Sequence, residues 1–333
     1  MNNFDESEYP WHQSSWNKIA NALSENHLPH ALLITGNEGT GKKDFSEQLA
    51  QLLLCTSVIK NKACGDCPSC KTYLSNANPD FLRIGLLEDK QQISVDQIRQ
   101  LSKFISYTRS YAAYRVILLN PTERMNKNAA NSLLKSLEEP ASNTIIILVA
   151  TSLSDVIPTI KSRCQLLSLP TPNNNEAISW LKSRSIINPE ELLEIAQGQP
   201  LTALNVSDDT IKSRLEFAKD ISDVCTNKKS LTEIAKKWEK YEKYTILNWQ
   251  ISWVENHVRH ISLSNPSPIK NENSSNIFNM LESKIKPIKI WDLHQKLIHQ
   301  KQYAHTSVNP LLFIENMLLL WLQASNNGNQ RYN

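Results

Sequence analysis

The chain has 333 residues, of which 40% are hydrophobic and 21% are charged, and its formal net charge is +3. This length predicts two or three domains of an ordinary globular protein, and the small net charge excludes DNA binding by overall electrostatics alone. Without a run of about 18 apolar residues, and with a polar, acidic start unlike a signal peptide, the chain is predicted to be cytoplasmic and to have no membrane partner.

Short apolar runs alternate with helical patterns over residues 1–170. Because uninterrupted apolar strands suit a sheet covered on both faces, and because they alternate with helices, the sheet is predicted to be parallel. The predicted strands are 31–35, 81–84, 116–119, 145–149 and 166–169, and the predicted helices are 43–55, 93–105 and 129–138. Residues 1–170 are therefore predicted to form an α/β domain.

The rest of the chain shows no strand pattern. Residues 170–175, Pro-Thr-Pro followed by three asparagines, are predicted to be a linker. Two short helices, at 177–184 and at 189–197 with Gly198 as a cap, predict a small helical lid domain at 171–207. An all-helical domain is predicted at 208–325 and a disordered tail at 326–333, from helical patterns at 211–224, 231–261, 277–285, 291–302 and 310–322.

The first predicted strand runs into a glycine-rich loop, residues 36–42, with the sequence Gly-Asn-Glu-Gly-Thr-Gly-Lys. Its spacing, between a strand and a helix, matches the phosphate-binding loop G-x-x-x-x-G-K-[ST]. In that motif backbone N–H groups and a helix N-terminus hold phosphates, and the lysine reaches the terminal ones. The predicted nucleotide-binding residues are Gly36, Gly39, Gly41 and Lys42.

Two positions that hold Mg²⁺ in such sites differ in this sequence. Lys43 replaces the Ser or Thr hydroxyl, and Asn120-Pro121 follow the third strand where an acid normally stands. Glu123 lies slightly further on and is predicted to be a solvated helix-cap residue. Loss of both Mg²⁺ positions predicts that this site does not hydrolyse ATP, and leaves weak nucleotide binding open.

Four cysteines, Cys55, Cys64, Cys67 and Cys70, are close together in the sequence. In a cytosolic chain this spacing indicates a metal site rather than disulfides, and four thiolates complete a closed, structural Zn²⁺ site. An iron–sulfur cluster also takes four cysteines, but a tight loop suits zinc better. The remaining alternative is a set of four unrelated buried cysteines.

Arg163 lies in Ser162-Arg163-Cys164, on a helix predicted to begin near Ile157. On residue chemistry alone it is a surface arginine paired with an acid, or an arginine finger that reaches the ATP of a neighbouring subunit. The first interpretation is favoured at this point. Cys164 and Cys225 are predicted to pack as small apolar residues.

The C-terminal half carries tryptophans and lysines within its helical patterns. Packing in a helical core is predicted for Trp238, Trp249, Trp253 and Trp321, rather than stacking on nucleic-acid bases. A mostly solvated helix face is predicted for Lys228, Lys229, Lys236, Lys237, Lys240 and Lys243.

Several segments of the chain carry a family resemblance. They are Pro10-Trp11 with Trp16, residues 28–33 (LPHALL), the four cysteines, residues 129–140 (AANSLLKSLEEP), Ser162-Arg163-Cys164, residues 198–204 (GQPLTAL) as a second-domain segment, and more weakly residues 309–312 (NPLL). In this order they resemble the clamp-loader subunits of the AAA+ class, and most closely the delta-prime family of bacterial DNA polymerase III. The resemblance covers most of residues 10–170.

The resemblance implies a five-subunit ring that opens a sliding clamp and places it on primed DNA, as part of a DNA-directed DNA polymerase holoenzyme. The implied partners are clamp-loader ATPase subunits of the gamma or tau type and a delta subunit, joined through a helical collar. Arg163 would act in trans on an adjacent subunit's ATP, and the chain would be a rigid stator without hydrolysis of its own. Leu201 stands where the ATPases use a second-domain arginine, a third departure from them.

Two other functions stay open from the residues. One is an active clamp-loader ATPase that uses Lys42 and Glu123, and the other is a zinc-dependent nucleic-acid-binding protein. Lys43, Asn120 and Leu201 argue against the first, and the small net charge argues against the second.

Overall fold

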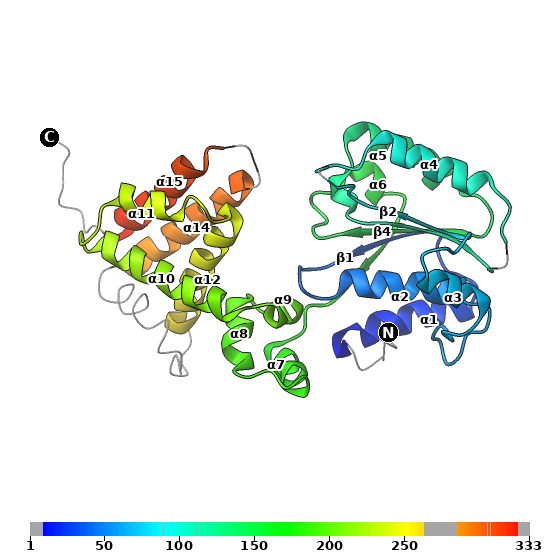
Figure 1. Cartoon of the computed structure of the whole chain (residues 1–333), viewed down its shortest axis with the longest axis horizontal. Helices are drawn as coiled ribbons and strands as arrows, with labels where there is room; N and C mark the ends of the chain where they lie inside the picture. Colours follow the sequence, from blue (N-terminus) through cyan, green and yellow to red (C-terminus); the bar gives the residue numbers. More distant parts are fainter. Residues whose placement is uncertain are drawn as a thin grey trace. The chain divides into compact units, whose positions relative to one another are not determined.

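The computed structural model describes residues 9–88, 90–110, 112–262, 285–304, 306 and 308–325 (Figure 1). The predicted tail at 326–333 and nearly all of the helical pattern at 277–285 lie outside the described residues. The chain forms two compact units. The first runs to Ile187 and includes Gly198–Leu204, and the second comprises Asn188–Gln197 and the chain from Asn205 onward.

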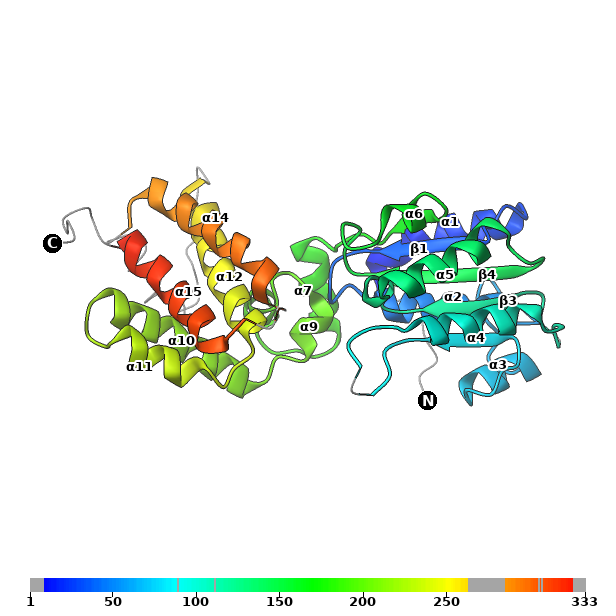
Figure 2. The same ribbon diagram turned by 90° about the horizontal axis from the view of Figure 1, so that it is seen from above.

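The described strands of the first unit form one parallel sheet. Its strands are β1 (Ala31–Thr35), β2 (Phe81–Ile84), β3 (Arg115–Leu119), β4 (Thr144–Ala150) and β5 (Gln165–Ser168), in the order β2-β3-β4-β1-β5. β1 lies between β4 and β5, with Ala31 opposite Ile146 and Leu32 opposite Gln165. Figure 2 shows β4 between β3 and β1. The predicted parallel α/β fold is confirmed.

Helices cover both faces of this sheet (Figure 1). One face carries α1 (Gln13–Ser24), α2 (Lys42–Leu54) and α3 (Pro68–Leu74), and the other carries α4 (Val95–Ser106), α5 (Lys127–Glu138) and α6 (Pro158–Lys161). Successive strand residues point to opposite faces, so Leu32 and Ile34 pack with α1 and α2 while Ala31 and Leu33 pack with α4 and α5. The apolar side chains of these strands are therefore buried on both faces of the sheet.

Polar side chains fix the starts of several helices. Ser94 and Gln97 form a capping box at α4, and the Asn126 side chain accepts the N–H of Ala129 at α5. Asn173 does the same for Glu176 and starts α7 (Asn174–Ser183). The prediction that residues 170–175 are a linker is therefore wrong at its C-terminal end. Asn173 is the N-cap residue of α7, and the next two asparagines are its first helical residues.

The segment between the predicted lid boundaries holds a helix that the sequence pattern missed. α8 (Pro189–Ile195) ends before Gln197, and a further short helix, α9 (Pro200–Leu204), follows Gly198. A helix of only five residues completes too few turns to show a 3.6-residue periodicity. The proposed boundaries at 171–207 and 208–325 stay predictions.

The second unit is helical throughout its described part. Its remaining helices are α10 (Asp208–Cys225), α11 (Leu231–Trp238), α12 (Lys243–Ser262), α14 (Pro287–Ala304) and α15 (Pro310–Ser325). The pattern predicted as continuous from 231 to 261 is broken at 239–242, where the Tyr241 N–H donates to the Trp238 carbonyl in a turn. All of the tryptophans predicted for the core are buried here, Trp238, Trp249, Trp253 and Trp321.

The lysine-rich stretch is only partly the solvated face that its pattern predicts. The amines of Lys229 and Lys237 reach the carboxylate of Asp220, whose side chain is 2% exposed. Alternating charge in sequence cannot reveal a buried acid on a different helix. Across the described chain, no helix combines the length and apolarity that crossing a bilayer requires.

Candidate nucleotide and metal sites

The glycine-rich loop lies at the carboxyl end of β1 and opens α2, as predicted. Gly39 and Gly41 have φ angles of 65° and 90°, and Gly41 is the N-cap residue of α2. Both angles lie in the left-handed region, which glycine adopts without steric cost. The structure thus brings Gly36, Gly39, Gly41 and Lys42 together as one loop in front of a helix N-terminus.

Lys42 is held by its own loop. Its Nζ donates to the Asn37 carbonyl at 2.7 Å, and the Thr40 hydroxyl donates to the same oxygen at 2.8 Å. Burial lowers the pKa of Lys42, while the negative charges of Glu38 and Glu123 act to raise it. The Lys42 ammonium group therefore already has a hydrogen-bond acceptor and nearby negative charge. Bound phosphates would otherwise supply both.

Glu123 faces the protein rather than solvent. It lies in η3 (Thr122–Arg124), where its Oε1 accepts the backbone N–H of Thr151 at 3.1 Å. Its Oε2 is buried and has no hydrogen-bond partner among the described residues. The prediction of a solvated helix cap is wrong, because this short turn aims the carboxylate at the end of β4.

The donor set around the loop does not fit Mg²⁺. Lys43 is exposed and carries an ammonium group where a hydroxyl ligand is needed, and β3 is followed by the neutral Asn120 and by Pro121. Mg²⁺ prefers carboxylate, hydroxyl and water oxygens in octahedral geometry. Glu123 is the first acid in the sequence after β3, but one of its oxygens already accepts the N–H of Thr151.

Aromatic residues before α1 cover one side of the loop. The Nε1 of Trp11 donates to the Thr40 carbonyl at 2.9 Å, and Nε2 of His12 lies 2.8 Å from the same oxygen. Burial lowers the pKa of His12 to about 4, so its ring is neutral at pH 7 and Nε2–H donates. A methyl group on Gly41 would lie 3.0 Å from the His12 ring. Trp11 belongs to the motifs that carry the family resemblance, but no local pattern marks His12 as a loop contact.

Helix α9 covers the loop from another side. The Leu201 N–H donates to the Gly39 carbonyl at 3.1 Å. A methyl group on Gly39 would lie 2.6 Å from the Thr202 hydroxyl and 2.7 Å from the Gln199 Cβ. Leu201 therefore contacts the loop through its backbone, at the position where the related ATPases were expected to place an arginine. Neither Gln199 nor Thr202 was predicted, since α9 itself was missed.

The four cysteines form one cluster, as predicted. Their sulfur atoms all lie within 4.8 Å of one another, and the Cys55 and Cys64 sulfurs are 3.6 Å apart. Sulfurs around a tetrahedral zinc ion with bonds of about 2.3 Å would be about 3.8 Å apart, so the donor set fits such an ion. Cys55 follows the end of α2, and Cys67 is the N-cap residue of α3.

Backbone N–H groups point at these sulfurs. The N–H of Cys64 donates to Cys55 Sγ at 3.3 Å, and the N–H of Cys70 donates to Cys67 Sγ at 3.4 Å. Burial raises the pKa of Cys67, but hydrogen bonds from Thr56 and Cys70 outweigh it and lower this pKa to about 6, whereas burial raises the pKa values of Cys55 and Cys70. Donated hydrogen bonds favour the thiolate, which is the form that binds metal.

Arg163 lies in a turn after α6 rather than on that helix, so its predicted location is wrong. The helix ends at Lys161, and the Arg163 N–H donates to the Ile160 carbonyl. Its Nε lies 2.7 Å from Oε1 of Glu138, and its side chain is 34% exposed. The guanidinium is thus paired with a surface acid at the end of α5.

Comparisons with known proteins show which family this chain is similar to. A family described as "DNA polymerase III, delta subunit" matches residues 11–173. A DNA polymerase III subunit delta' from Haemophilus influenzae is 31% identical over 256 residues, 76% of this chain and 77% of that protein. Its counterpart from Pseudomonas aeruginosa is 29% identical over 320 residues, 94% of this chain and 97% of that protein.

A solved structure of a DNA polymerase III gamma subunit-related protein from Thermotoga maritima is 16% identical, with a TM-score of 0.46. The similarity covers 93% of this chain and 99% of that one. The matches to the two delta' proteins confirm the resemblance that the motifs carry, and the chain belongs to the DNA polymerase III subunit delta' family.

Proposed function

We propose that this clamp-loader subunit is a non-hydrolysing stator that supplies Arg163 to the ATP of a neighbouring subunit. One observation carries the proposal. The phosphate loop keeps its fold, but Lys43 and Asn120 occupy the positions that should hold Mg²⁺. Transfer of a phosphoryl group depends on that metal to position the phosphates and neutralise charge. We therefore assign a structural role to a phosphate loop that lacks the Mg²⁺-binding groups.

The protein contacts around the phosphate loop support rigidity. Lys42 is engaged by Asn37, Thr40 is engaged by Trp11 and His12, and Gly39 accepts a hydrogen bond from Leu201. These bonds join the segment before α1, the loop and α9 to one another through protein groups.

The surface position of Arg163 supports a role in trans. Exposed ion pairs contribute only about 0–1 kcal/mol, so Glu138 can release the guanidinium at small cost. A triphosphate from an adjacent subunit offers more negative charge and several acceptor oxygens, and binds arginine more strongly than one carboxylate does. Glu138 would hold the side chain at the surface until such a partner docks.

The proposed partners are gamma- or tau-type ATPase subunits and a delta subunit, and through them a sliding clamp and primed DNA, in the cytoplasm. Proteins named DNA polymerase III subunit gamma and subunit tau are 29% and 28% identical to this chain over 65% and 60% of its length. Ile288, Trp291 and Ile298 of α14 are 75%, 51% and 40% exposed. Their spacing of three and seven residues places them on one face of α14, and an exposed apolar face supports packing against another subunit's helices.

The proposed metal is structural Zn²⁺, held by Cys55, Cys64, Cys67 and Cys70. Elemental analysis of the purified chain should give about one equivalent of zinc and no iron. Cys70→Ser should lose that zinc, whereas Cys164→Ser should retain it, because burial raises the pKa of the Cys164 thiol to about 12 and Cys164 lies outside the cluster. Iron in place of zinc, or no metal, would contradict the assignment.

The test of the main proposal is reconstitution with ATPase and delta subunits. The purified chain alone should not hydrolyse ATP. Arg163→Ala should lower the DNA- and clamp-stimulated ATPase of the complex while assembly, followed by gel filtration, is unchanged. Glu138→Gln is the matched control, because it removes the ion pair but keeps the arginine, and should preserve activity. Turnover by the isolated chain, or an unaffected Arg163→Ala complex, would reject the proposal.

A further inference from the structure

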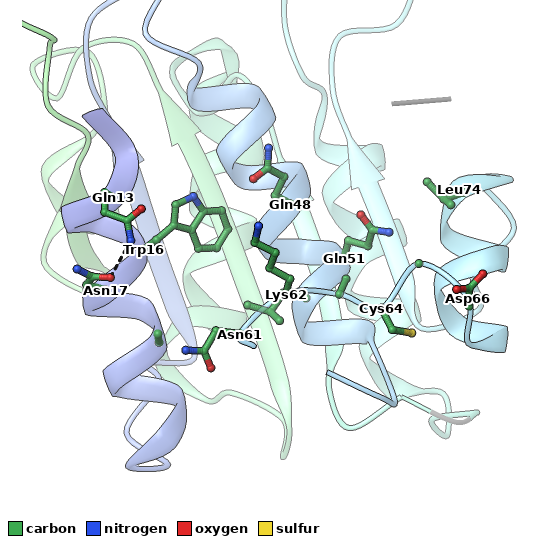
Figure 3. Close-up of a pocket in the computed structure, with 14 residues that line it drawn as sticks. Gln13, Trp16, Asn17, Gln48, Gln51, Asn61, Lys62, Cys64, Asp66 and Leu74 are labelled. Carbon is green, nitrogen blue, oxygen red and sulfur yellow. Dashed lines mark hydrogen bonds between the residues drawn. The ribbon is translucent and has the colours of Figure 1, made fainter. Parts of the chain in front are cut away.

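A pocket of about 430 Å³ lies beside α1, α2 and the loop that carries the cysteines (Figure 3). Protein pockets for small ligands and short segments commonly measure about 300–1,000 Å³. None of the residues that line this pocket belongs to the phosphate loop, and Arg163 is not among them. The pocket is therefore separate from the phosphate loop and from Arg163, and it shares only Cys64 with the cysteine cluster.

Carboxamide side chains dominate its polar lining. Gln13 and Asn17 of α1 are hydrogen-bonded to each other at 3.1 Å. The amides of Gln48 and Gln51 on α2, and of Asn61 on the cysteine loop, have no hydrogen-bond partner among the described residues. Each carboxamide offers both a donor and an acceptor, so the lining can pair with a ligand that alternates the two.

The charged side chains of the lining have opposite signs. Lys62 and Asp66 both come from the cysteine loop. A groove for a nucleic-acid strand or for a polyphosphate carries several basic groups that offset the phosphate charge. This pocket has no such excess, and its chemistry fits an uncharged ligand.

Trp16 and Leu74 give the pocket apolar anchors. The Trp16 ring rests on Phe45, with centroids 4.3 Å apart, and its indole N–H has no partner among the described residues. Leu74 is 50% exposed. In Figure 3 the labelled side chains follow one another from Asn17, past Trp16, to Leu74. Such a row suits an extended chain, which presents backbone amides along its edge and alternate side chains on one face.

We infer that this pocket binds a short, extended, uncharged peptide segment of a partner protein. The backbone N–H and C=O groups of the segment pair with the carboxamides of Gln48, Gln51 and Asn61, and one of its apolar side chains packs on Trp16. One wall of the pocket, including Cys64, belongs to the loop that the cysteine cluster shapes. Loss of the metal should therefore weaken peptide binding as well.

The test uses the purified full-length chain and a displayed library of random peptides about ten residues long. Selected peptides are synthesised and their dissociation constants are measured by fluorescence polarisation. Trp16→Ala, and separately the double variant Gln48→Ala with Gln51→Ala, should each weaken binding at least about tenfold. Trp16→Phe keeps an aromatic contact with Phe45, and it replaces the alanine variant in this measurement if that variant is poorly folded.

Lys18→Ala is the matched control, because Lys18 is an exposed residue on the same helix that does not line the pocket. It should leave the affinity unchanged, and chelation of the metal should reduce it. Oligodeoxythymidylate should not displace the peptide. Displacement by that oligonucleotide, equal binding to wild type and the pocket variants, or failure to select any peptide would each overturn the inference. Circular dichroism of each variant separates lost binding from lost folding.

Discussion

At the residue scale, Asp220 shows how one buried acid organises its surroundings. Its carboxylate accepts hydrogen bonds from Lys237 at 2.7 Å, Lys229 at 3.0 Å and the Trp238 indole at 3.2 Å. Burial raises the pKa of Asp220, but these hydrogen bonds outweigh it and hold the pKa below the usual range. The acid thereby ties α10 to α11 and to the turn between them.

Asp220→Asn should lower the free energy of unfolding by about 1–3 kcal/mol, because charged hydrogen bonds to a buried acceptor are weakened and two ammonium groups lose their counterion. Urea unfolding followed by circular dichroism measures the change. Glu216→Gln is the matched control, since Glu216 contacts the same Lys237 at 3.4 Å but is 64% exposed. It should change stability by less than about 0.5 kcal/mol. Equal effects of the two substitutions would contradict the role of burial.

The stability difference between wild type and Asp220→Asn should depend on pH. A carboxyl whose pKa is lowered on folding stabilises the native state above its unfolded pKa, which is about 3.9, and loses that contribution as the pH falls through the native value. The difference should therefore be constant near neutral pH and shrink below about pH 4. A difference that grows on acidification would show that the native pKa is not lowered.

At the scale of elements, the phosphate loop and α9 fit each other without room for an added methyl group. Gly39→Ala should combine the strain of a left-handed φ with the clash against Thr202 and Gln199. Gly198 is the matched control, because its φ is 77° but nothing lies within 4 Å of an added Cβ. Gly39→Ala should therefore be less stable than Gly198→Ala by about 1–3 kcal/mol.

Thermal or urea unfolding of the two variants tests this contact. If both lose the same stability, the left-handed φ alone explains the cost, and α9 does not press on the loop. If Gly39→Ala is worse, the loop is held by protein contacts that a nucleotide would have to accommodate.

Elements with strong local signals were predictable from sequence, and long-range contacts were not. The strands β1 to β5 lie within one residue of their predicted bounds, because continuous apolar runs mark buried parallel strands. The cysteine cluster was predictable because its ligands are close in sequence. The contact between Arg163 and Glu138 spans 25 residues, and that between His12 and Thr40 spans 28. Nothing in a local pattern fixes which acid or carbonyl such side chains will reach.

At the scale of the whole molecule, α8 belongs with the helical unit although α7 and α9, on either side of it, belong with the first unit. Glu194 of α8 lies 3.8 Å from the guanidinium of Arg214 and accepts a hydrogen bond from Asn256 at 3.1 Å. Gln197 donates to the Asn248 carbonyl at 2.7 Å. The chain thus passes between the units more than once within residues 171–207, which were predicted to form one lid domain.

A fragment of residues 188–333 should therefore fold and be more stable than one of residues 205–333. The shorter fragment lacks Glu194 and leaves Arg214, whose side chain is 6% exposed, without its carboxylate. We expect a loss of about 1–3 kcal/mol, measured by thermal unfolding of the two fragments.

A fragment of residues 198–333 separates the contribution of α8 from that of chain length. It restores α9 but not α8, and α9 makes its contacts with the phosphate loop of the other unit. This fragment should therefore match the stability of 205–333 and not that of 188–333. If it matches 188–333 instead, the added stability comes from α9 or from length, and the assignment of α8 to the helical unit is wrong. Glu194→Gln in the longest fragment should remove part of the gain, because the amide keeps a hydrogen-bonding group but no charge for Arg214.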